Sequence, residues 1–233
     1  MVVKYNDGNY ELNEAYRSIR TFISVDESLK TILVTSAEMD EGKSTGTANM
    51  ARCFSELEDK KTIVLDCDFR KKGINEQFGI SRSSMGLSNL IYNGASLEEC
   101  LKKDGNLDIL PCGTVHSNPS VLLELDRTKK FIHSLRDKYD YIFIDSPPIL
   151  RVNDACILAQ YVDGVVLVTA SKETDKHEVK ATKDRLMKVN ANIIGVVLNK
   201  FQSKGNTIYS YYGYDDEDDK KSKKKKRKRK KHF

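Results

Sequence analysis

The chain has 233 residues, of which 39% are hydrophobic and 31% are charged. This length and composition fit one globular domain with a sizeable core, and no apolar run approaches the roughly 20 residues that a membrane-spanning helix needs. The net charge of +5 is unevenly distributed, because eleven of the 39 basic residues lie between 220 and 231. The rest of the chain has 28 basic and 34 acidic residues and is therefore acidic. The basic character therefore belongs to the tail and does not indicate a fold that binds nucleic acid.

The N-terminus and the cysteines suggest a cytoplasmic protein. Residues 1–7 contain no apolar signal-peptide core. The five cysteines include no C-x-x-C pair; they are Cys53, Cys67, Cys100, Cys112 and Cys156. An odd, unpatterned set predicts buried thiols in a reducing compartment.

The predicted elements alternate between strands and helices. A helix is expected first at 13–25, followed by strands that are nearly continuous Val, Ile and Leu, as in central strands covered on both faces. The expected strands are 32–36, 62–66, 107–110, 141–145, 164–170 and 193–199, and the helices between them are 44–58, 120–138, 154–161 and 175–189. This order predicts a doubly wound, mostly parallel α/β sheet with helices on both faces, and the Gly42-Lys43-Ser44 run after its first strand indicates the P-loop NTPase type. The strand carboxyl ends should share one ligand-binding edge.

The pattern stops after about residue 203, so we expect a domain over 1–203 and a tail over 204–233. The tail is rich in Tyr and Gly at 206–214, wholly acidic at 215–219 and almost wholly basic at 220–231. Such segments bury too little apolar surface to order themselves, so we expect the tail to be flexible.

A phosphate-binding loop follows the strand 32–36. Gly42, Lys43 and Ser44 lie where a helix begins, so backbone N–H groups and the helix dipole can hold a β-phosphate. Lys43 would bridge the β- and γ-phosphates, and the Ser44 hydroxyl would bind Mg²⁺. The match to G-x-x-x-x-G-K-[ST] is incomplete, because Ala37 stands at the first glycine. An ordinary loop with a surface lysine is the alternative interpretation.

Three aspartates follow buried strands at the same expected edge of the sheet. Asp66 and Asp68 end one strand and Asp145 ends another. Carboxylate oxygens suit Mg²⁺, and one acid could accept a proton from an attacking hydroxyl. Singly, such acids are more often solvated turn residues, but two strands and a phosphate loop together favour a magnesium-nucleotide site.

With these motifs in place, the chain resembles the bacterial tyrosine kinases (BY-kinases) that control capsule and exopolysaccharide synthesis. The resemblance covers about residues 10–214 and includes a tyrosine-rich C-terminus. Its motifs are the loop end Glu41-Gly42-Lys43-Ser44-Thr45, the D-x-D-x-R of Asp66, Asp68 and Arg70, the D-x-P-P of Asp145, Pro147 and Pro148, and the E-x-x-R-x-x-R of Glu14, Arg17 and Arg20.

The resemblance implies specific roles for these residues. ATP and Mg²⁺ would be bound, with Asp66 as the base and with Ser44, Asp68 and Asp145 around the metal. Asn199 would contact adenine, although a turn-forming asparagine is an open alternative. Glu14, Arg17 and Arg20, on one helical face, would pack neighbouring subunits into a ring; a solvated charged face is the alternative.

The phosphate loop departs from the family pattern at two positions. The usual Pro-Gly before Glu-Gly-Lys-Ser is Met39-Asp40 here. If the Asp40 side chain points inward, it repels phosphate by at least about 1 kcal/mol, so we expect weakened ATP affinity or a need for an activating partner. Related partition ATPases carry a lysine at the position of Glu38, which counts against that function.

The tail suggests an acceptor and a membrane contact. Tyr209, Tyr211, Tyr212 and Tyr214 are the expected phosphate acceptors, with a sticky aromatic tail or late strand as the alternative. The basic run 220–231 should attract an anionic membrane surface, where a membrane adaptor of polysaccharide export could activate the kinase. Non-specific polyanion binding or pairing with the acidic body is the alternative, and specific nucleic-acid binding is not expected because no groove-reading motif is present.

The sequence thus predicts an ATP-dependent protein-tyrosine kinase that phosphorylates its own tail. Two other hypotheses remain at this stage. One is a nucleotide-binding assembly module, a pseudokinase, in polysaccharide export. The other is a positioning ATPase that transfers phosphate to water.

Overall fold

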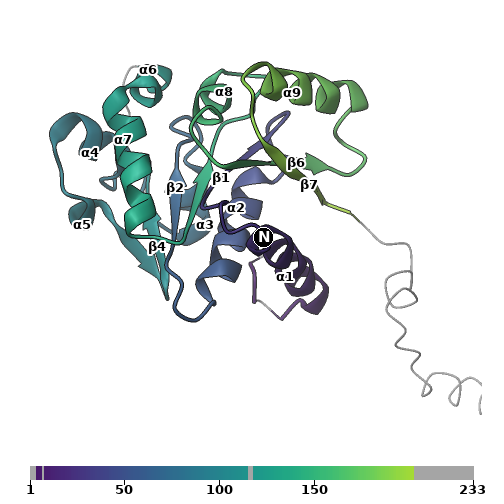
Figure 1. Cartoon of the computed structure of the whole chain (residues 1–233), viewed down its shortest axis with the longest axis horizontal. Helices are drawn as coiled ribbons and strands as arrows, with labels where there is room; N and C mark the ends of the chain where they lie inside the picture. The colour runs from purple at the N-terminus through teal and green to yellow at the C-terminus, as the bar shows by residue number, and fades with distance from the viewer. Residues whose placement is uncertain (1–3, 7, 115–117, 202–233) are drawn as a thin grey trace, which may run out of the picture. The chain divides into compact units, whose positions relative to one another are not determined.

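The computed structural model describes residues 4–6, 8–114 and 118–201. They form a seven-stranded sheet in the order β3-β4-β2-β5-β1-β6-β7 (Figure 1). Its strands are β1 (Thr31–Ser36), β2 (Thr62–Asp66), β3 (Lys102–Asp104), β4 (Leu107–Leu110), β5 (Tyr141–Asp145), β6 (Gly164–Ala170) and β7 (Ile193–Asn199). Neighbouring strands pair in parallel except for β3, which is antiparallel to β4. The predicted doubly wound, mostly parallel sheet is confirmed.

Helices cover both faces of this sheet (Figure 1). They are α1 (Tyr10–Ser24), α2 (Lys43–Ser55), α3 (Gly73–Phe78), α4 (Leu87–Asn93), α5 (Leu97–Cys100), α6 (Pro119–Glu124), α7 (Asp126–Ser134), α8 (Asp154–Leu158) and α9 (Lys176–Lys188), with a short 3-10 turn, η1 (Leu135–Asp137). The helices α1 to α3 pack on one face, and α4 to α9 pack on the other.

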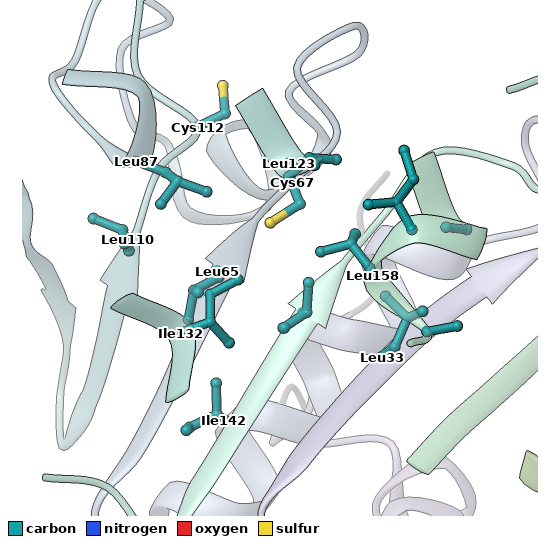
Figure 2. Packing of buried hydrophobic residues seen from close by; sticks show 14 of the residues in the cluster. Leu33, Leu65, Cys67, Leu87, Leu110, Cys112, Leu123, Ile132, Ile142 and Leu158 are labelled. Atoms are coloured by element: carbon teal, nitrogen blue, oxygen red, sulfur yellow. The ribbon is translucent and has the colours of Figure 1, made fainter. Parts of the chain in front are cut away.

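Each face has its own buried core, because successive residues of a strand point to opposite sides. Within β1, Ile32 and Val34 join the core under α1 to α3, whereas Leu33 joins the other. Figure 2 shows the second core, where Leu33, Leu65 and Ile142 from three adjacent strands meet side chains of the covering helices. The buried strands are therefore apolar on both faces, which is why the sequence shows continuous apolar runs.

The six predicted strands are present, and the differences lie in short elements. The strand β3 reads Lys-Lys-Asp and is wholly exposed, so no apolar pattern marks it. Helices α3, α4 and α5 span only 6, 7 and 4 residues, too few to show a helical period. The predicted helix 120–138 is instead broken at Leu125, which has an extended backbone (φ −60°, ψ 133°). The first helix begins earlier than expected, because the Asn9 side chain caps it by accepting from the Leu12 N–H.

The cysteines are free thiols, four of them buried and Cys156 partly buried. Among the residues that the structure describes, no helix is both long enough and apolar enough to cross a membrane. Residues up to Asn199 form one compact unit. The expected tail from 204 onward lies outside the described residues.

Candidate active site

The phosphate loop connects β1 to α2, and its last residue requires glycine. Gly42 has a φ of 89°, and a Cβ there would lie 1.9 Å from the Nδ2 atom of Asn199. The Asn199 amide donates to the Glu41 carbonyl at 2.9 Å. Asn199, at the end of β7, therefore braces the loop from the side. Whether it also contacts adenine stays a prediction.

Glu41 also braces the loop rather than facing the phosphate position with its side chain. Its carboxylate is buried and accepts from the Glu38 backbone N–H at 2.7 Å. The hydroxyl of Thr174, in the loop before α9, donates to the other oxygen. Sequence reasoning did not find Thr174, because no motif marks a residue 133 positions away in the chain. Glu41 would meet a nucleotide through its backbone.

Lys43, the first residue of α2, is buried among acids. Its ammonium lies 3.1 Å from Asp68 Oδ2 and 3.4 Å from the Ser44 hydroxyl. Burial alone would lower the pKa of Lys43, but the negative charges of Asp145 and Asp68 outweigh it and raise the pKa. The lysine is therefore held as a cation at the position where it can neutralise phosphate.

The three predicted aspartates converge as expected. Asp66 and Asp145 are register partners on the adjacent strands β2 and β5, and both are fully buried. The Asp68 backbone N–H donates to Asp66 Oδ1 at 2.9 Å, which places the second acid of the D-x-D directly beside the first. Lys43 joins this group from α2. The sequence motifs from β1, β2 and β5 thus form one site.

Crowding of these acids changes their proton affinity. Burial raises the pKa of Asp66 well above its usual range, and the charges of Asp145 and Asp68 raise it further. Burial also raises the pKa of Asp145 to about 6, although the Lys43 charge opposes the shift. A cluster of buried carboxylates with too few counter-charges is a site that favours an added cation.

The donor set fits Mg²⁺. Within the described residues, Asp66 Oδ2 and Asp145 Oδ2 are buried oxygens without a hydrogen-bond partner. The other oxygen of Asp145 accepts from the Thr47 hydroxyl at 3.2 Å, so its carboxylate is fixed in direction. Ser44, Asp68 and Asp145 could hold a hard cation through hydroxyl and carboxylate oxygens. The Thr45 hydroxyl accepts from Gln77 Nε2 at 3.1 Å and supports the same helix end.

The unusual acids of the phosphate loop, Asp40 and Glu38, are each held in an ion pair. Asp40 has a φ of 62°, its side chain is 77% exposed, and its carboxylate pairs with Lys71. Glu38 pairs with Arg151, which follows β5. The condition for direct repulsion of phosphate by Asp40, an inward carboxylate, is therefore not met.

The predicted ring residues lie on α1 and differ in their surroundings. Glu14 and Arg17 pair with each other at 2.6 Å on the surface. Arg20 instead donates to the Cys53 carbonyl at 2.6 Å and lies 4.0 Å from Glu56, so it also holds α1 against α2. The predicted acceptors Tyr209, Tyr211, Tyr212 and Tyr214 and the basic run lie outside the described residues.

A strand, glycine-containing loop and helix, with a lysine and three aspartates at the sheet edge, define a P-loop nucleotide-binding domain. A family profile described as an AAA domain matches residues 29–201. The tyrosine-protein kinase YwqD of Bacillus subtilis is 34% identical over 206 residues, which cover 86% of this chain and 86% of YwqD.

Two solved structures extend the comparison. The kinase domain of VpsO has a TM-score of 0.76 at 37% identity, over 82% of this chain and 96% of that domain. The septum site-determining protein MinD of Pyrococcus horikoshii, solved with Mg-ADP, has a TM-score of 0.63 at 25% identity, over 75% of this chain and 72% of MinD. The chain belongs to the bacterial tyrosine-protein kinases.

Proposed function

We propose that this protein uses Mg·ATP to phosphorylate tyrosines of its own C-terminal tail and thereby regulates the synthesis and export of a capsular or extracellular polysaccharide. One observation carries the phosphotransfer part: the Lys43 ammonium is 3.1 Å from Asp68, in a pocket of acids that includes Asp66 and Asp145. The kinase names of its relatives support the reaction, and the Mg-ADP of the MinD structure supports the nucleotide and the metal.

The chain's own groups suffice to position and polarise the reactants. Lys43 and the backbone N–H groups at the start of α2 would neutralise the phosphates. Ser44, Asp68 and Asp145 would hold Mg²⁺, which would supply positive charge to offset the negative charge of the phosphates.

Asp66 would accept the proton of the tyrosine hydroxyl, since a carboxylate with a raised pKa is the better base. The tyrosine oxygen then forms a bond to the γ-phosphorus while the bond to the β–γ bridging oxygen breaks, and ADP leaves.

The acceptors in this proposal are Tyr209, Tyr211, Tyr212 and Tyr214. A ring formed through Glu14, Arg17 and Arg20 would bring the tail of one subunit to the site of the next at high effective concentration. Each phosphate adds roughly −1.5 to −2 charge beside the acidic run 215–219, and the resulting repulsion would loosen the ring.

The proposed location is the cytoplasmic face of the cell membrane. The eleven basic residues between 220 and 231 support this part, because each is worth roughly 1 kcal/mol near an anionic lipid surface. There the kinase would meet a membrane adaptor that activates it. Co-sedimentation of the full chain with anionic liposomes should fade at high salt; equal binding after removal of 220–233 would refute the membrane contact.

The main alternative is a positioning ATPase, which the likeness to MinD favours. Glu38 argues against it, because its carboxylate pairs with Arg151 at the position where the related ATPases carry a lysine. A pseudokinase that binds nucleotide without transfer is the other alternative.

Mass spectrometry of the tail after incubation with Mg·ATP, with and without an adaptor's cytoplasmic segment, separates the three functions. We expect phosphotyrosine in the wild type and none in Lys43→Met. Equal tail phosphorylation in both would refute autokinase activity. Steady phosphate release without phosphotyrosine would identify the ATPase, and bound nucleotide with neither product would identify the pseudokinase.

A further inference from the structure

Lys71 lies beside the phosphate-binding lysine although no motif assigns it a role. Its backbone N–H donates to Asp68 Oδ1 at 3.1 Å. The other oxygen of that carboxylate, Oδ2, is 3.1 Å from the Lys43 ammonium. Only one carboxylate therefore separates the Lys71 backbone from Lys43. A lysine side chain at position 71 is long enough to reach the nucleotide phosphates that Lys43 is expected to bind.

The loop that carries Lys71 packs directly on the expected metal ligands. A Cβ placed on Gly73 would lie 2.3 Å from the Ser44 hydroxyl and 3.6 Å from Asp145 Oδ2. Only glycine fits there without displacing Ser44. The end of the loop between β2 and α3 thus lies against Ser44 and Asp145, two of the expected metal ligands.

The ion pair between Lys71 and Asp40 crosses this position. Asp40 follows β1 and Lys71 follows β2, and these two strands are separated in the sheet by β5. A contact between their loops therefore passes across the carboxyl end of β5, where Asp145 stands. The pair is a bridge across the mouth of the site.

The bridge is built from groups that can exchange partners. The Lys71 side chain is 47% exposed and the Asp40 side chain is 77% exposed, so water screens their attraction and the pair is weak. A terminal phosphate carries more negative charge than one carboxylate and accepts several hydrogen bonds from an ammonium group. Phosphate should therefore displace Asp40 from Lys71.

We propose that Lys71 is a second phosphate-binding lysine, which exchanges its partner Asp40 for the terminal phosphate when a nucleoside triphosphate binds. The inference rests on the nucleotide site of the proposed function and gives Asp40 a mechanism. Asp40 lowers affinity for the triphosphate by competing for Lys71, not by facing the phosphates. A diphosphate lacks the terminal group and leaves the pair in place.

Calorimetric titration of the full chain with ADP and with ATP, the latter as a non-hydrolysable β,γ-imido analogue, in the presence of Mg²⁺ tests the inference without kinase turnover. The variants are Lys71→Ala, Asp40→Asn and the double variant. Asparagine keeps the size of Asp40 and tolerates its positive φ, so it removes only the charge. Lys60→Ala is the matched control, because Lys60 also forms an exposed pair, with Asp140, next to the opposite end of β2.

We expect Lys71→Ala to weaken ATP binding about tenfold and ADP binding less than about twofold, as for loss of one charge-assisted hydrogen bond. Asp40→Asn should tighten ATP binding about threefold when Lys71 is present and have no effect when it is absent. Lys60→Ala should change neither affinity.

An unchanged ratio of ATP to ADP affinity in Lys71→Ala would overturn the inference, as would an equal effect of Asp40→Asn with and without Lys71. The kinase proposal fails separately. Absence of tail phosphotyrosine would refute it even where the two nucleotide affinities respond as expected.

Discussion

Asp66 and Asp145 stand side by side at the carboxyl ends of the adjacent strands β2 and β5, and each has one buried oxygen without a hydrogen-bond partner among the described residues. Two carboxylates in such a place lower the stability of the fold, since burial and mutual repulsion both oppose their charges. The site therefore favours a further cation in addition to the Lys43 ammonium.

Asparagine at either position should separate stability from activity. Asp66→Asn or Asp145→Asn keeps the side-chain shape and removes a repelled charge. We therefore expect the free energy of unfolding of the metal-free protein to rise by about 1 kcal/mol and its melting temperature by roughly 2–4 °C. Tail phosphorylation should fall by about 10²-fold or more.

Thermal unfolding in a chelating buffer and phosphotyrosine mass spectrometry measure the two effects. Asp140→Asn is the control, because Asp140 is partnered by Lys60 and should lose stability slightly when neutralised. A lower melting temperature for both Asp66→Asn and Asp145→Asn would contradict the claim that repulsion between these carboxylates lowers stability.

Glycine at position 40 should tighten ATP binding. Asp40→Gly relieves the backbone strain of a non-glycine residue at φ 62° and frees Lys71. We expect a gain in ATP affinity of about threefold to tenfold. Calorimetry with ATP is the measurement, and if affinity does not rise, the assignment of weakened binding to Asp40 is wrong.

Loss of the Asn199 side chain distinguishes its two possible roles. Asn199→Ala removes the hydrogen bond to the Glu41 carbonyl and leaves space beside Gly42. Bracing alone predicts that affinities for ATP and GTP fall together, by about threefold to tenfold. An adenine contact predicts that only ATP binding falls, so the ratio of the two affinities decides between them.

The arginines of α1 should differ in what they stabilise. Arg17→Ala removes an exposed pair with Glu14 and an interaction with the Tyr5 side chain. Because exposed pairs contribute little, we expect lost assembly and a smaller fall in melting temperature than for Arg20→Ala. Arg20→Ala also frees the Cys53 carbonyl, so we expect a loss of about 1 kcal/mol of stability in addition. Analytical ultracentrifugation and thermal unfolding test both; unchanged assembly in Arg17→Ala would favour the solvated-face interpretation.

The sheet and the meeting of its acids could be predicted because strong, repeated signals mark them. Apolar runs define the six longer strands, and parallel order brings Lys43, Asp66 and Asp145 to one edge. Local sequence is enough for these positions, since Asp66 and Asp145 end strands and Lys43 begins the helix after the phosphate loop.

The features that could not be predicted from the sequence depend on contacts between distant segments. The outward direction of Asp40 is set by Lys71, and the loop is braced by Thr174 and Asn199, which lie far along the chain. The helix is broken at Leu125, which is neither glycine nor proline. No local pattern carries such information.

The shared carboxylate of Asp68 limits how this segment can evolve. One of its oxygens closes the turn through the N–H groups of Arg70 and Lys71, and the other holds Lys43. An insertion or deletion between 66 and 71 would move one of these contacts away from the other. Length variation among descendants of this chain should therefore be confined to the stretch beyond Gly73, while the turn itself keeps a fixed residue count.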